Sequence, residues 1–135
     1  MTIMLSNGER TVDIGSGAVL FSVLSTVKIK LNSILDSVPH ALHFLESGEC
    51  IFEDALITAR EINLIRDQLS CLSPNDAVYD MNNLSVKAPW KNNISPVVTS
   101  CANLYTTADG KDLLFEIVNL LVYSSTTFQN VIVAG

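Results

Sequence analysis

The chain has 135 residues, of which 48% are hydrophobic and 16% charged, and its formal net charge is −6, with a pI near 4.6. This composition excludes an intrinsically disordered protein and predicts a single domain, residues 1–135, with a sizeable core. The acidic charge argues against direct binding to nucleic acid or to anionic membranes, and it favours cationic protein partners.

The N-terminal residues do not place a basic segment before an apolar one, so we expect no signal peptide. The longest apolar run, residues 18–24, is interrupted by Ser22 and is too short for a membrane span. The cysteines Cys50, Cys71 and Cys101 are widely spaced and form neither a disulfide framework nor a CxxC site. We therefore expect reduced thiols in a cytoplasmic protein.

The first third of the chain predicts a β-hairpin followed by a helix. Residues 2–5 and 11–14 are β-compatible, and the Asn-Gly pair between them favours a tight turn. Ser16 is a suitable N-cap. Apolar residues at three- and four-residue spacings then predict a helix that includes Leu35 and ends at Pro39.

Two further helical segments are predicted in the middle of the chain. Residues 40–46 favour a short helical turn, and residues 49–52 favour a brief strand or the entry to the next helix. That helix carries Glu53 and Asp54 in its first turn, where the helix dipole favours acids. Ser73-Pro74-Asn75 ends it. Arg60 and Glu61 belong to its polar side, and its apolar stripe is formed by Leu56, Ala59, Ile62, Ile65, Leu69 and Leu72.

The last part of the chain alternates short predicted elements. Strands are predicted for residues 77–81, 104–107 and 131–133, and a helical turn for residues 96–103. An almost wholly apolar helix is predicted for residues 111–124. Asp109 is its expected N-cap, and Asp112 lies three residues further on, in the capping-box position. Short strands interspersed with three main helices predict an α+β fold, with a small, mostly antiparallel sheet packed against those helices.

The loop that follows residue 81 contains the only tryptophan, Trp90, directly after Pro89. A buried tryptophan there would pin the loop to the core. An exposed one would present an anchor to a partner, because tryptophan is enriched at binding hot spots. Both interpretations stay open on sequence grounds.

Catalytic and metal-binding patterns are sparse. His40 and His43 would share one helical face with Glu46, but no second pair of ligands is near in sequence, so we expect neither a metal site nor a cofactor. No nucleophile motif is present. A small hydrolase that uses His40 and His43 with a distant carboxylate or thiol remains an alternative.

Acidic residues are concentrated in the middle of the chain. Between Leu31 and Ala59 there is no lysine or arginine, and from Asp67 to Val86 the charged residues are again only acids. Such runs are usually solvated faces. A patch of one sign is also a candidate docking surface for a cationic protein.

Three stretches resemble the immunity protein 70 family: Ile14-Gly15-Ser16 with the helix that follows, residues 88–95, and residues 105–113. The resemblance spans most of the chain and is most specific from Pro89-Trp90 to Leu113. Members of that family carry a second proline before the tryptophan and a glycine after it. Ala88 and Lys91 occupy these positions here, so the loop is expected to differ in shape.

The resemblance implies a bacterial immunity protein of polymorphic or contact-dependent growth inhibition toxin systems. Such a protein is cytoplasmic, has no catalytic activity of its own, and binds the C-terminal domain of one cognate toxin. Many of these toxins are nucleases with basic clefts, which an acidic protein would attract. We therefore expect occlusion of the active site or of the substrate-binding surface of the toxin.

As a hypothesis, the toxin-binding carboxylates are Glu46, Glu49, Glu53, Asp54, Asp76 and Asp80, with Trp90 as a structural anchor or hot spot. The protein is expected to be a monomer or a small homo-oligomer. The very apolar helix at residues 111–124 leaves open a different class of function, an oligomeric adaptor or structural module.

Overall fold

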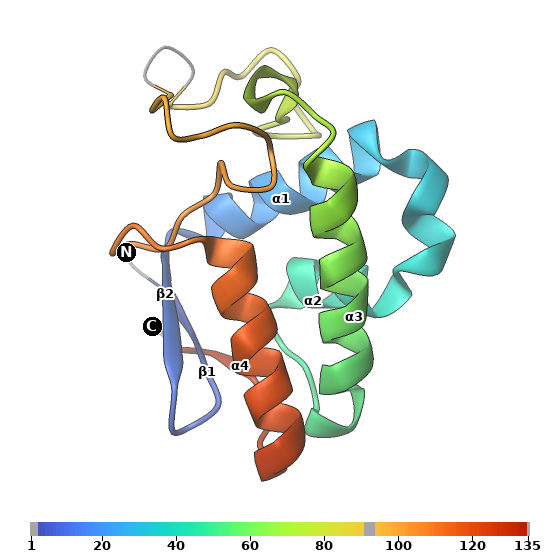
Figure 1. The fold of residues 1–135 in the computed structure, drawn as a ribbon, viewed down its shortest axis with the longest axis vertical. Helices are drawn as coiled ribbons and strands as arrows, with labels where there is room; N and C mark the ends of the chain where they lie inside the picture. Colours follow the sequence, from blue (N-terminus) through green and yellow to red (C-terminus); the bar gives the residue numbers. More distant parts are fainter. Residues whose placement is uncertain (1–2, 91–93, 135) are drawn as a thin grey trace.

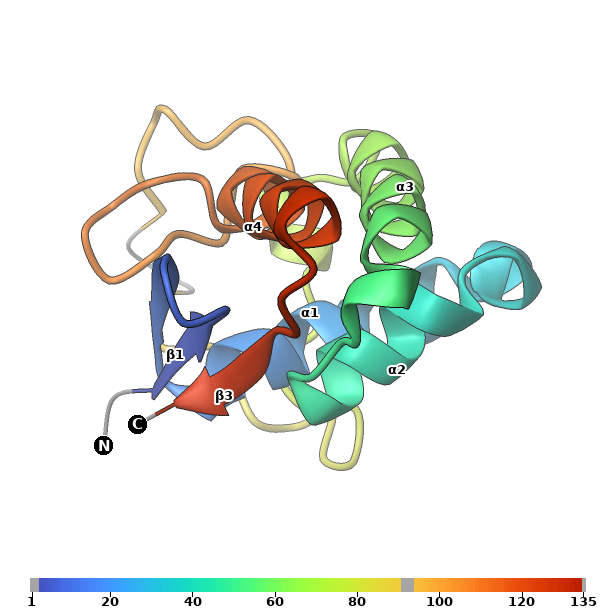
Figure 2. The ribbon, with the colours of Figure 1, turned by 90° about the horizontal axis from the view of Figure 1, so that it is seen from below.

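The computed structural model describes residues 3–90 and 94–134. A small sheet lies along one side of a group of helices, seen almost edge-on in Figure 1 and from below in Figure 2. The fold is α+β with an antiparallel sheet, as predicted. In the described part of the chain, no helix has both the length and the apolar character needed to cross a membrane.

The sheet has three strands in the order β2-β1-β3, and both pairings are antiparallel. The strands are β1 (Ile3–Ser6), β2 (Thr11–Gly15) and β3 (Ile132–Ala134). They lie close to the predicted strands, although Thr2 of the first prediction falls outside the described residues. Alternate side chains of the hairpin face the helices and are buried, namely Leu5, Val12 and Ile14.

The helix after the hairpin is shorter than predicted. Helix α1 (Gly17–Lys30) begins after Ser16, whose side chain accepts a hydrogen bond from the Ala18 amide, so the predicted N-cap is confirmed. It ends at Lys30 rather than beyond Leu35, and a 3-10 segment, η1 (Asn32–Ser37), follows. β-branched residues in the last turns of α1 lower its helix propensity, which favours this early end.

The predicted helical turn at residues 40–46 is a complete helix, α2 (Pro39–Ser47). Pro39 occupies its first turn, where a missing amide hydrogen costs little. The helix ends at Ser47, and Gly48, which has φ of +74°, follows as its C-cap.

The two longest helices, α3 (Phe52–Leu69) and α4 (Leu113–Thr127), pack against each other. The predicted stripe of α3 is correct at Ile62, Ile65 and Leu69, which are fully buried. It is wrong at Leu56, which is 43% exposed. Ala55 and Thr58 are buried instead, so the buried face is rotated at the start of the helix.

The N-cap of α4 is Asp112 and not Asp109, because the Asp112 side chain accepts a hydrogen bond from the Phe115 amide. Asp109 instead accepts a hydrogen bond from the Thr107 hydroxyl in the preceding turn. Most apolar side chains of α4 are buried within the chain. Their burial explains the apolar composition from which the adaptor alternative arose.

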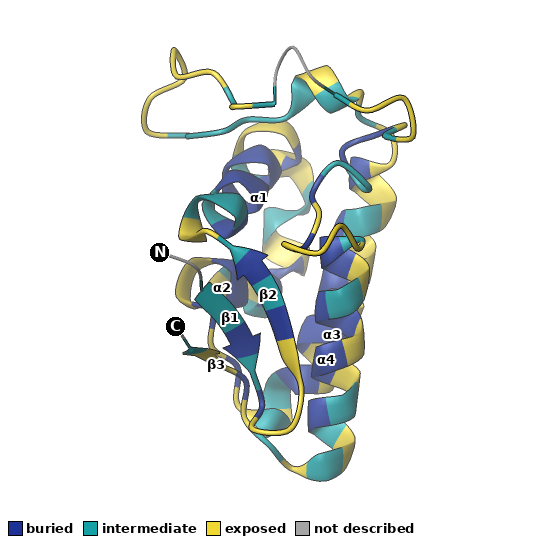
Figure 3. Ribbon diagram, turned by 90° about the vertical axis from the view of Figure 1, so that its left-hand side faces the viewer, coloured by how far each residue is buried: buried dark blue, intermediate teal, exposed yellow. Residues whose placement is uncertain are grey.

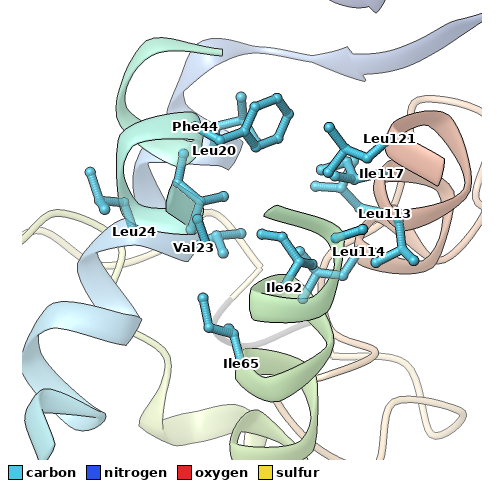
Figure 4. Packing of buried hydrophobic residues seen from close by; sticks show 14 of the residues in the cluster. Leu20, Val23, Leu24, Phe44, Ile62, Ile65, Leu113, Leu114, Ile117 and Leu121 are labelled. Carbon is cyan, nitrogen blue, oxygen red and sulfur yellow. The ribbon is translucent and has the colours of Figure 1, made fainter. Parts of the chain in front are cut away.

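The core lies where α1, α2, α3 and α4 converge (Figure 4). Phe44 of α2 belongs to the same core cluster as aliphatic side chains that the other helices contribute. The labelled ones are Leu20, Val23 and Leu24 of α1, Ile62 and Ile65 of α3, and Leu113, Leu114, Ile117 and Leu121 of α4.

A long irregular segment covers one end of the helices (Figure 3). We call it the loop region, residues 70–90 and 94–112; it contains a single 3-10 turn, η2 (Pro74–Asp76), among its described residues. The strands predicted at 77–81 and 104–107 and the helical turn at 96–103 are wrong, apart from one isolated bridge between Thr106 and Asp112.

Hydroxyl groups of α1 explain the missing strand at residues 77–81. Ser22 and Thr26 donate hydrogen bonds to the Val78 carbonyl at 2.8 and 3.2 Å, and the Val78 amide donates to Thr26 at 2.8 Å. The Met81 amide donates to Ser25. The backbone of this stretch therefore finds partners on a helix and needs no neighbouring strand.

Candidate functional site

A pocket of about 530 Å³ opens between the beginnings of α2, α3 and β3. Its lining comes from three elements and their neighbours. Helix α2 contributes His40 and His43, and β3 contributes Ile132. The start of α3 and the segment before it contribute Glu49, Ile51 and Asp54. We call this part of the molecule the pocket region, residues 39–61 and 128–132. In Figure 2 it is the side on which α2 and β3 lie next to each other.

A buried carboxylate positions α2 at the edge of the pocket. Glu61 of α3 is only 8% exposed and accepts hydrogen bonds from the backbone amides of His40 and Ala41, at 2.8 and 3.0 Å. Its second oxygen lies 2.8 Å from Nδ1 of His40. Because the first amides of a helix lack intrahelical partners, Glu61 acts as the N-terminal cap of α2 from a distant helix.

The floor of the pocket is fixed by backbone pairing. Cys50 and Val131 form an isolated antiparallel bridge, and the Phe52 amide donates a hydrogen bond to the Asn130 side chain. Gly48 comes just before this bridge, and a β-carbon at its position would lie 2.3 Å from Cγ2 of Val133. Any larger residue at this position would therefore have to displace the Val133 side chain and adopt a positive φ.

Apolar side chains stand exposed around the pocket. Ile51 and Ile132 line it and are 50% and 51% exposed. Phe128, just outside it, is 73% exposed and packs edge-to-face against Phe52, with the ring centroids 5.6 Å apart. Phe128 also has φ of +57°, the one non-glycine residue with positive φ in the described part of the chain.

The pocket also contains the groups of the hydrolase alternative. His40, His43 and Cys50 all line it, but Cys50 Sγ contacts Thr58 Oγ1 and the Ile51 carbonyl. Burial raises the pKa of the Cys50 thiol, and the nearby Asp54 carboxylate acts in the same direction. Since the thiolate is the nucleophilic form, this environment is the opposite of an activated cysteine.

No group of three or more His, Cys, Asp or Glu side chains is arranged to hold a metal ion, as far as residues 3–90 and 94–134 are concerned. His40 and His43 do share the pocket with Glu49 and Asp54. The nearest acidic partner of His40 is nevertheless Glu61, which is committed to the cap of α2.

The six predicted carboxylates lie in three places. Glu49 and Asp54 line the pocket, and Glu53 is exposed beside Asp54 in the first turn of α3. Glu46 lines a separate hollow of about 610 Å³ together with Lys28.

Asp76 and Asp80 lie beyond the opposite end of α3, which at 18 residues is about 27 Å long. Asp76 accepts a hydrogen bond from the Ser73 amide, and Asp80 accepts one from the Asn82 amide. Both carboxylates therefore hold turns of the loop region. The toxin-binding role of all six carboxylates stays a prediction.

Trp90 lies in the loop region and not near the pocket. It is half-buried and packs edge-to-face with Tyr79 and Tyr105, at centroid distances of 5.7 and 5.9 Å. Tyr105 in turn contacts the hydroxyls of Ser22 and Thr26 through its own hydroxyl, at 2.9 and 3.0 Å. Trp90 thus connects the loop to α1 through Tyr105, which is the geometry of an anchor.

Glu61 and Phe128 did not stand out in the sequence. The sequence pattern assigns Glu61 to the polar side of its helix, which is wrong. Glu61 follows Thr58 by three residues and precedes Ile65 by four, so it lies on the buried face. Phe128 follows a run of polar residues, and nothing in its neighbourhood signals a positive φ.

The family model for immunity protein 70 matches residues 5–133 of the chain. No curated protein and no solved structure matches this chain. The match includes every described strand and helix except the first residues of β1 and the last residue of β3. This chain therefore belongs to the immunity protein 70 family.

Proposed function

We propose that this protein binds the C-terminal domain of one cognate bacterial toxin, a basic nuclease, and neutralises it without catalysis. Membership of an immunity protein family supports the binding and neutralisation of a toxin. The net charge of −6 supports a basic nuclease as the toxin, because a nuclease must present positive charge to its substrate and an acidic protein is attracted to the same surface.

The observation that carries this proposal, beyond the family, is the distribution of charge. The stretch from Leu31 to Ala59 has no lysine or arginine, and it folds into η1, α2 and the first turns of α3. The carboxylates of this segment therefore have no basic partner within it, and the exposed ones form a candidate docking surface for a cationic protein. Bound to a toxin, this surface would block the active site or the route of the nucleic acid to it.

Co-expression tests the proposal. The probe is the C-terminal domain encoded by the reading frame immediately upstream, expressed in a sensitive host with and without this protein. We expect growth arrest by the toxin domain alone and rescue by co-expression. Arrest that persists despite expression of folded protein would contradict the proposal.

A titration separates binding from catalysis. With purified components, plasmid cleavage by the toxin domain is measured against increasing amounts of this protein. A stoichiometric inhibitor abolishes cleavage when the two are equimolar. An enzyme that inactivates the toxin would abolish it at a small fraction of that amount, given time. If the toxin domain cleaves no nucleic acid, only the assignment of the toxin as a nuclease is contradicted.

A further inference from the structure

The pocket region combines a hollow, negative charge and exposed apolar side chains. Glu49 and Asp54 line the pocket, and Ile51 and Ile132 stand half-exposed at its edges. Exposed apolar side chains beside a small number of charged ones are typical of surfaces at which proteins bind each other. In the loop region, by contrast, Asp76 and Asp80 accept hydrogen bonds from backbone amides nearby.

The chemistry of the pocket selects a cation. Two helices begin here, and helix N-termini attract anions. Side chains of the protein already accept hydrogen bonds from these amides, however. Glu61 accepts those of His40 and Ala41 at the start of α2, and Asn130 accepts that of Phe52 at the start of α3. Apart from two histidines, the charged side chains that line the pocket are Glu49 and Asp54, and their carboxylates favour a lysine or arginine side chain over a phosphate.

Phe128 gives a second and independent indication of binding. A phenylalanine at φ of +57° is strained, and glycine or asparagine would end α4 with less strain. Its contact with Phe52 offsets part of this strain, yet 73% of the residue remains exposed. Local strain that keeps an aromatic ring in solvent is an outlier that points to function.

We propose that the cognate toxin docks on the pocket region, with one lysine or arginine side chain between Glu49 and Asp54 and an apolar contact on Ile51, Phe128 and Ile132. This inference rests on the proposed function and names the surface that performs it. The loop region, including Trp90, then lies outside the interface.

Matched pairs of variants test the location. The dissociation constant for the upstream-encoded toxin domain is measured by calorimetry for Glu49→Gln/Asp54→Asn and for Asp76→Asn/Asp80→Asn. Both pairs remove two negative charges, so long-range attraction falls equally. We expect about 100-fold weaker binding for the first pair and less than about threefold for the second.

The apolar contact is tested with Phe128→Gly. Glycine relieves the strained φ, so the melting temperature should hold or rise, whereas affinity should fall by about tenfold or more. A merely structural phenylalanine would give the reverse result, lower stability with unchanged affinity. Val97→Ala is the control, because Val97 is an equally exposed apolar residue in the loop region.

The outcomes separate the two proposals. If the wild-type protein does not bind the toxin domain, the proposed function fails and this inference fails with it. If it binds and both pocket variants bind as tightly as wild type, only the location is overturned. A larger loss from Asp76→Asn/Asp80→Asn would move the interface to the loop region.

Discussion

Backbone polar groups that helices and strands leave without a partner are satisfied differently in the pocket region and in the loop region. In the pocket region one carboxylate, Glu61, accepts two helix amides, and the Cys50–Val131 bridge completes the floor. In the loop region, hydroxyls of α1 bond the backbone of Val78 and Met81, and exposed side chains such as Asp76 and Asp80 accept hydrogen bonds from amides of their own turns. The first region depends on a few charged or sterically unique residues, and the second on several weaker contacts.

This difference predicts where single substitutions do the most harm. Loss of a buried charged contact, or a new steric clash, should lower the free energy of unfolding more than loss of a neutral hydrogen bond does. The unfolding of the two regions can also be followed with different spectroscopic probes. Trp90 lies in the loop region, so its fluorescence follows that region, whereas far-ultraviolet circular dichroism follows the helices.

The largest effect is expected for Glu61→Ala. It leaves the amides of His40 and Ala41 without their acceptor and should lower the free energy of unfolding by about 3 kcal/mol, measured by urea denaturation. Glu61→Gln keeps an acceptor oxygen and should cost about half as much. Equal losses for the two variants would show that capping is not the source of the effect.

Gly48→Ala comes next. The methyl group would meet Val133 Cγ2 in a backbone with positive φ, so we expect a loss of about 2 kcal/mol. The double variant Gly48→Ala/Val133→Ala removes the clash but not the strain and should recover part of the loss. If it recovers nothing, the steric explanation is wrong.

Tyr105→Phe probes the loop region. Removing the hydroxyl takes away its contacts with Ser22 and Thr26. Because both residues still bond to Val78, we expect the free energy of unfolding to fall by only about 1.5 kcal/mol. The unfolding transition followed by Trp90 fluorescence should shift to lower urea. If circular dichroism shows the same shift, the two regions unfold as one cooperative unit; if it shows none, the loop region opens separately.

The smallest effect is a loss of stability at high pH. Burial raises the pKa of Cys101 from 9.0 to about 11, so the thiol keeps its proton in the folded state over a range where the unfolded chain loses it. Stability is therefore complete below about pH 9 and falls as pH rises through 11, by about 1 kcal/mol at pH 10. Cys101→Ala should flatten this dependence; an unchanged slope would assign it to other groups.

The regular elements were largely predictable because periodic apolar residues and local caps determine them. Ser16, the Asn-Gly turn and the buried stripe of α3 beyond its first turns are such cases. The loop region was not predictable in the same way. The strand predicted at residues 77–81 has β-compatible residues, but its partners are Ser22, Ser25 and Thr26, far away in sequence.

The candidate site shows the same limit. The acidic character of residues 31–59 is visible in the sequence, but the pocket arises because Ile132 and Asn130 return from the end of the chain to lie beside Glu49 and Asp54. The role of Glu61 likewise depends on a contact between two helices. Composition therefore indicates that the segment is acidic, whereas tertiary structure is needed to tell which of its carboxylates line the pocket.

The position of β1 in the middle of the sheet has a consequence for synthesis of the protein. Its hairpin with β2 is formed by the first 15 residues, but its other neighbour is β3, at Ile132–Ala134. During translation the second edge of β1 stays open until nearly all of the matched sequence has left the ribosome. The same late residues complete the pocket, so the pocket cannot form before Asn130, Val131 and Ile132 have left the ribosome.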